Sequence, residues 1–171
     1  MSLYSMDKQR YPDSYRGGVI RFLCFFRRAQ NSKNLILKKI YRRLTRRYRE
    51  QHGLEIPDDL KVGGGLYICH PYGITVNPGA VLGENINIHK GVTIGQENRG
   101  PRQGAPVIGN FVWIGVNASV VGAVHIGNDV LIAPNSYVNC DVPDHSVVFG
   151  NPCVIKHKDN ATEGYINRIA E

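Results

Sequence analysis

Glu55 and His70 are the two residues whose types and spacing most directly suggest catalysis. They lie fifteen residues apart, and His70 sits in a turn bounded by Gly65 and Gly73. A histidine with an ordinary pKa of about 6.5 can accept a proton at neutral pH. A carboxylate bonded to the second ring nitrogen fixes the tautomer and stabilises the protonated ring. The pair predicts general-base catalysis by His70 with Glu55 as its orienting acid, whereas a lone histidine in such a turn would be a polar corner residue.

A six-residue repeat supplies the elements that would position this pair. Ten units between residues 70 and 143 open on an aliphatic residue, and the fifth residue of most units is small or β-branched. The opening residues are Val76, Leu82, Ile88, Ile94, Ile108, Ile114, Val120, Ile126, Ile132 and Val138. A helix would space apolar residues by three or four and a strand by two. A strict repeat of six residues predicts a parallel β-helix, in which three short faces, each of six residues, make one coil.

Two consequences follow from a six-residue repeat. A β-sandwich is disfavoured, because its turns recur every ~8–12 residues. The separation of Glu55 and His70 is nearly one coil, so adjacent turns could bring the two side chains together.

Length and composition indicate one structural unit of ordinary globular character. The chain has 171 residues, 42% of them hydrophobic, which is enough to bury a core. Its four cysteines follow neither a disulfide framework nor zinc-site spacing, so we expect free thiols in a reducing compartment. No secretory signal and no apolar run of ~18 residues is present. These features predict a cytoplasmic protein.

The first third of the chain is strongly basic. Residues 1–61 hold 15 of the 21 lysines and arginines but 6 of the 14 acidic residues, a net charge of +9. Residues 34–51 place apolar side chains at helical spacing opposite a basic face, and Gly53 ends this helix. The helix could cap the solenoid with its apolar stripe on the first coil, contact an anionic membrane at its inner face, or do both. Nucleic-acid binding is disfavoured because no recognised module accompanies the charge.

Several motifs from Leu54 onward carry a family resemblance. They are the Glu55–His70 pair, V-T-I-G at residues 92–95, W-I-G at 113–115 and G-N-P-C-V-I at 150–155. This segment, 54–157, resembles the serine acetyltransferase branch of the left-handed β-helix acyltransferases. The resemblance implies an all-β solenoid, a left-handed parallel β-helix of hexapeptide repeats. A basic, largely helical segment, 1–53, precedes it, and a tail, 158–171, follows.

The resemblance also implies an activity. Enzymes of this kind transfer an acetyl group from acetyl-CoA to a hydroxyl, and a base must remove the hydroxyl proton, the role expected for His70. His89, in the next coil, is a second candidate that could line a neighbouring subunit's site, or else a solvated corner residue. Similar proteins form homotrimers with sites between subunits, and we expect the same assembly here.

Residues 100–107 interrupt the repeat, and loops on rigid scaffolds commonly carry specificity. In similar serine acetyltransferases an Arg-His pair precedes the proline of this loop and holds the serine carboxylate. Gly104 and Ala105 occupy those places here, and Arg102 could partly substitute. The expected acceptor is therefore one without serine's charged groups.

Cys69 and Tyr72 flank His70 and complete the predicted acceptor site. The family has an acid where Cys69 stands. Because an unpaired charge is costly to bind in a pocket, we expect the hydroxyl of a sugar or glycan as acceptor. Serine O-acetylation in cysteine biosynthesis is the alternative. A non-catalytic β-helix scaffold or binding module is an alternative of another class.

The acetyl-CoA site is expected in the second half of the solenoid, as the resemblance implies. Small corner residues and the exit turn would contact the coenzyme: Gly115, Ala133, Gly150, Asn151 and Pro152, with Lys156 available for a phosphate. The tight corners of a solenoid also favour small residues for steric reasons alone, without any bound coenzyme. No metal is expected, because the carbonic-anhydrase-like branch of the fold uses histidines five residues apart, and His89 and His125 lack such partners.

Overall fold

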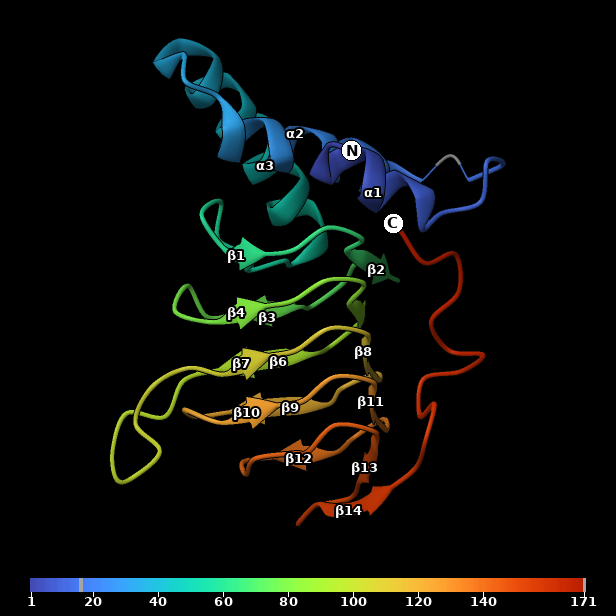
Figure 1. Cartoon of the computed structure of the whole chain (residues 1–171). Coiled ribbons are helices and arrows are strands. Elements are labelled where there is room, and N and C mark those ends of the chain that lie inside the picture. Colours follow the sequence, from blue (N-terminus) through green and yellow to red (C-terminus); the bar gives the residue numbers. More distant parts are fainter. Residues whose placement is uncertain (16, 171) are drawn as a thin grey trace.

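Short strands wind into a solenoid with three sheets as its faces (Figure 1). The computed structural model describes residues 1–15 and 17–170. Sheet 1 holds β1 (Lys61–Val62), β4 (Val81–Leu82), β7 (Val107–Ile108) and β10 (His125–Ile126). Sheet 2 holds β2 (Tyr67–Cys69), β5 (Asn87–His89), β8 (Val112–Ile114), β11 (Val130–Ile132), β13 (Ser146–Phe149) and β14 (Val154–His157). Sheet 3 holds β3 (Thr75–Val76), β6 (Thr93–Gly95), β9 (Ser119–Val121) and β12 (Tyr137–Val138). The pairs are parallel except β13 with β14.

The predicted inward positions of the repeat form the core. All ten opening residues are at most 3% exposed, and nine of the ten fifth-position residues are buried with them. The exception is the exposed Asn98, where the loop begins to leave the coil. Burial of apolar surface stabilises a fold by about 25 cal/mol per Å², so this continuous column is the main source of stability. The parallel β-helix predicted from the sequence is confirmed.

The corners between sheets 1 and 2 are held by side chains that bond to the coil before. The Asn110 side-chain oxygen accepts a hydrogen bond from the Glu84 amide, and Asn128 does the same for Asn110, both at 2.8 Å. Gly109 is required here, because a Cβ atom would lie 2.8 Å from the Gly127 carbonyl oxygen. These bonds satisfy the backbone groups that a corner leaves unpaired.

Two helices close the first coil. α1 (Leu3–Gln9) and α2 (Gly18–Asn31) lie over it (Figure 1), and α2 buries Val19, Phe22, Leu23 and Phe26 in the same cluster as Leu54 and Ile56. Beneath the helices, Arg27 of α2 donates to the Asp7 carboxylate of α1 at 2.7 and 3.0 Å. Both side chains are almost fully buried. The cap is therefore joined by apolar packing and by one buried ion pair.

The third helix lies outside this cap. α3 (Leu35–His52) begins at Asn34, whose side chain accepts from the Ile36 and Leu37 amides, and ends at Gly53 with φ of 59°. Its Tyr48 ring stacks on Phe22. The expectation that its apolar stripe covers the first coil is wrong, because α2 occupies that surface. Among the described residues, no helix is both long and apolar enough to cross a membrane.

The C-terminal tail runs back along sheet 2 toward α1 (Figure 1). Over residues 158–170 it forms turns and bends. Asp129, in the left-handed conformation with φ of 52°, accepts from the Ala161 and Thr162 amides at 2.9 Å. Burial would raise the pKa of Asp129, but hydrogen bonds from Thr162 and His145 outweigh it and lower this pKa. The carboxylate that anchors the tail therefore stays ionised at neutral pH.

Candidate active site

The edge between sheets 2 and 3 gathers most of the predicted site residues. Cys69 pairs in register with His89. Gly115 follows Ile114, which pairs with Ile88, and Ala133 follows Ile132, which pairs with Ile114. Four successive coils therefore stack Cys69, His89, Gly115 and Ala133 along one edge. His89 and the predicted acetyl-CoA residues Gly115 and Ala133 therefore lie along one edge of the solenoid, and His70 directly follows Cys69 at the same edge.

His70 occupies the corner between β2 and β3. Its side chain is exposed and its φ is 53°, a left-handed conformation that non-glycine residues adopt infrequently. Its carbonyl accepts from the Tyr72 amide at 2.7 Å. The Tyr72 ring is 57% exposed and lies 5.0 Å from the ring of His52. An exposed imidazole on a fixed turn is accessible to a substrate.

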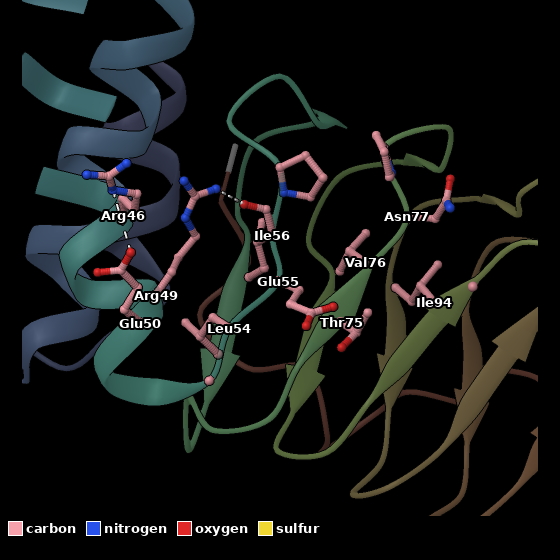
Figure 2. Close-up of a pocket in the computed structure, with 14 residues that line it drawn as sticks. Arg46, Arg49, Glu50, Leu54, Glu55, Ile56, Thr75, Val76, Asn77 and Ile94 are labelled. Carbon is pink, nitrogen blue, oxygen red and sulfur yellow. Dashed lines mark hydrogen bonds and ion pairs between the residues drawn. The ribbon is translucent and has the colours of Figure 1, made fainter. Parts of the chain in front are cut away.

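Glu55 lies beside the strand that leaves the His70 corner. It forms a parallel bridge with Thr75, and its amide donates to the Ile74 carbonyl at 2.8 Å. The carboxylate points outward from sheet 3 into a groove of about 660 Å³ that Arg49 and Asn77 also line (Figure 2). No hydrogen bond joins the side chains of Glu55 and His70 in the described chain. Catalytic hydrogen bonds often form only when substrate binds, so the pair stays a prediction.

His89 lies next to His70 and is half-buried. Its ring centroid is 4.6 Å from that of Trp113, and its Nε2 atom is buried without a hydrogen-bond partner. Burial, followed by the nearby His70, lowers the pKa of His89. The imidazole is therefore neutral at pH 7, and its Nε2 atom is available to a bound ligand.

Of the predicted acetyl-CoA residues, Gly115 is the most constrained. A Cβ atom there would lie 2.6 Å from the Pro134 nitrogen and 2.8 Å from the Trp113 ring. Gly150, Asn151 and Pro152 form the turn between β13 and β14, and the Asn151–Pro152 peptide is cis. Lys156 lies on β14 with its ammonium 5.7 Å from the centre of the Phe149 ring. The β13–β14 turn and Lys156 therefore lie at the C-terminal end of the solenoid, on the last strands of sheet 2.

Arg102 is not brought to His70 within one chain. The loop 96–106 lies between sheets 3 and 1, whereas His70 lies between sheets 2 and 3. The Arg102 guanidinium donates to the Asn139 carbonyl, and its own carbonyl accepts from the Ala123 amide. A site that used both residues would need a second subunit. Among the described residues, no group of three or more His, Cys, Asp or Glu side chains is arranged so that it could hold a metal ion.

The sequence did not reveal the part of the site that the tail supplies. Tyr165 packs edge-on against Trp113 at 5.1 Å, so a residue of the tail reaches the histidine edge. Arg10, in the turn after α1, lies on the same face. Contacts between such distant parts of a chain leave no periodic pattern, and no local motif marked these residues.

Comparison with known proteins decides the family. The profile described as "Bacterial transferase hexapeptide (six repeats)" matches residues 105–140. The serine acetyltransferase of Helicobacter pylori is 32% identical over 142 residues, which cover 83% of this chain and 82% of the relative. The chain belongs to the serine acetyltransferase family. It is therefore an acetyl-CoA-dependent O-acetyltransferase, as the resemblance implied.

Solved structures agree with this assignment. Neisseria gonorrhoeae serine acetyltransferase in complex with serine is 30% identical, with a TM-score of 0.69 over 90% of this chain and 67% of its own. The Brucella abortus serine acetyltransferase reaches a TM-score of 0.74 at 26% identity, covering 91% of this chain and 68% of that one. The chain spans about half of the Staphylococcus aureus relative, 53%, at 35% identity. The left-handed β-helix fold is confirmed.

Proposed function

We propose that this member of the serine acetyltransferase family transfers the acetyl group of acetyl-CoA to the hydroxyl of serine. The relatives carry that name, and the Neisseria structure contains serine. The position of His70 carries the mechanism, since it lies exposed on the edge that also holds Gly115 and Ala133. These relatives favour serine over the sugar acceptor expected from the sequence.

His70 acts as the general base in this proposal. Its imidazole removes the proton of the acceptor hydroxyl as the oxygen attacks the thioester carbonyl. The carbon–sulfur bond then breaks, and the protonated imidazole returns the proton to the departing thiolate of coenzyme A. Glu55 orients His70 and stabilises its protonated form once the substrate draws the two together.

A sugar or glycan hydroxyl is the second candidate acceptor. Gly104 and Ala105 offer no charged group to a serine carboxylate, and Arg102 is already bonded to the Asn139 carbonyl. A neutral hydroxyl needs no such clamp.

Acceptor turnover separates the two candidates. Release of the coenzyme A thiol is measured with L-serine and with a panel of sugar nucleotides and oligosaccharides at equal concentrations. We expect kcat/KM for serine to exceed that for any sugar by at least about tenfold, a difference in transition-state free energy of about 1.4 kcal/mol. Faster turnover with a sugar would contradict the serine proposal and support the argument from Gly104 and Ala105.

A homotrimer would bring the separated parts of the site together. The loop with Arg102 and the corner with His70 lie at different edges of the solenoid, and a cyclic assembly places one subunit's edge against the next. Light scattering should give three times the chain mass of 19.1 kDa. A monomeric enzyme that is fully active would contradict a site shared between subunits.

Peripheral contact with an anionic membrane, at its cytoplasmic side, also stays a proposal. Leu35 and Ile36 at the start of α3 are 74% and 72% exposed, and basic residues such as Lys38, Lys39 and Arg43 adjoin them. Each basic residue near an anionic surface contributes about 1 kcal/mol. Co-sedimentation should occur with vesicles of anionic lipid and not with neutral vesicles, and a Leu35→Glu, Ile36→Glu double variant should lose it. Equal sedimentation of the variant would contradict insertion of this tip.

A further inference from the structure

A second cavity, of about 290 Å³, lies between sheet 2 and the C-terminal tail. Cys69 and His89 line it from the solenoid, Trp113 and Tyr165 form its aromatic wall, and Arg10 and Arg168 bring positive charge. Cys69 directly precedes His70, and His89 interacts electrostatically with His70. Two residues that line this cavity are therefore neighbours of the proposed general base, one in the chain and one in space.

Arg10 gives the cavity a buried positive charge, and among the residues that the structure describes no carboxylate bonds to it. The residue is 3% exposed. Its guanidinium donates to the carbonyls of Gly65 and Asn167 and to the side-chain oxygens of Asn85 and Asn87, all of them neutral acceptors. Burial lowers the pKa of Arg10 to about 10, which leaves it protonated at neutral pH.

An acid that acts electrostatically on this guanidinium is already engaged by another arginine. Asp7 interacts electrostatically with Arg10, but both of its oxygens bond to Arg27. A buried charge without a partner of opposite sign is costly. An anionic ligand would supply the missing charge.

The other polar groups of the cavity agree with an anion rather than a cation. Arg168 is exposed in the tail and adds a second guanidinium. The neutral His89 ring can donate a hydrogen bond to an anion from its unpartnered Nε2 atom in the tautomer that carries the proton there. No aspartate or glutamate lies among the described residues that line the cavity. An ammonium group would therefore find no acidic partner here, whereas a carboxylate or phosphate would meet two guanidinium groups.

We propose that this cavity binds the anionic group of the acceptor, a carboxylate or a phosphate, and so directs the acceptor hydroxyl to His70. The inference rests on the proposed function and deepens it. It replaces the clamp that Gly104 and Ala105 lack with Arg10 and Arg168, drawn from the two ends of the chain. It also makes the ammonium of serine dispensable for binding, so a hydroxy acid such as glycerate is an acceptor analogue.

The single tryptophan of the chain reports on this cavity directly. Trp113 is the only tryptophan and forms part of the wall, so its fluorescence is followed in the full-length protein without acetyl-CoA. We expect a saturable change on titration with glycerate, with inorganic phosphate, or with both, and none with serinamide, which has an ammonium and no carboxylate. Response to only one of the two anions identifies the anionic group. Absence of a saturable response to both would overturn the proposal.

Arg168→Gln tests the contact without disturbing the core, because the side chain is exposed. We expect the dissociation constant for the responding anion to rise about tenfold or more. Arg47→Gln, at an exposed position of α3 away from this cavity, is the matched control and should bind as the parent does. Equal affinity in both variants would overturn the proposal. Anion binding without serine turnover would contradict the proposed function alone, and serine turnover unaffected by Arg168→Gln would contradict the inference alone.

Discussion

Replacing His70 with asparagine should lower kcat/KM for acetyl transfer by about 10²- to 10⁴-fold, the usual contribution of a positioned general base. Asparagine is the appropriate substitution because the His70 backbone has φ of 53°, and Asn117 and Asn135 adopt the same conformation at other corners. The variant therefore removes the base while the turn is preserved. Thiol release from acetyl-CoA measures the rate, and circular dichroism checks the fold.

His125→Asn is the matched control for this variant. His125 is also exposed, but it lies on sheet 1, away from the edge that holds His70. We expect its rate to equal that of the parent protein. A His70→Asn protein that retained its rate would exclude His70 as the base.

Replacing Asp7 with asparagine should lower the free energy of unfolding by about 3–5 kcal/mol, because it leaves a buried guanidinium without its counter-charge. The Asp7 and Arg27 side chains are 0% and 2% exposed, and Arg27 also donates to the carbonyls of Val62 and Gly63 in the first coil. A loss of this size is a large part of the total of about 5–15 kcal/mol available to a typical domain. Urea denaturation measures it.

An exposed ion pair provides the control for this experiment. Arg46 and Glu50 lie 3.6 Å apart on α3, with side chains 64% and 67% exposed. Solvent screens such a pair, so Glu50→Gln should change the free energy of unfolding by less than about 1 kcal/mol. A similarly small change for Asp7→Asn would show that the cap is held by apolar packing alone.

The solenoid could be predicted from the sequence because its signal is local and repeated. Each unit places its first and fifth residues inward, and between Val76 and Val142 only Asn98, at the start of the inserted loop, departs from this pattern. The edge that holds His70, Gly115 and Ala133 follows from the same register. The ends of α3 were also predicted, since Asn34 and Gly53 act through their immediate neighbours.

Contacts between distant segments could not be predicted in the same way. The bond between Asp7 and Arg27 and the return of the tail to Trp113 depend on tertiary packing, which leaves no period in the sequence. The four cysteines are free, as expected, yet the sulfurs of Cys140 and Cys153 lie 3.6 Å apart although no spacing motif joins them.

The loop between sheets 3 and 1 can change without disturbing the coils on either side. Val107 pairs with Val81 in the coil before it and with His125 in the coil after it, so the strand register is restored directly beyond the loop. Insertions confined to a corner leave every inward-facing side chain in place. One residue added inside a strand would instead turn the inward-facing side chains after it outward. The length and sequence of this loop can therefore change in evolution without altering the coils. Substrate specificity can diverge while the solenoid and its catalytic edge are conserved.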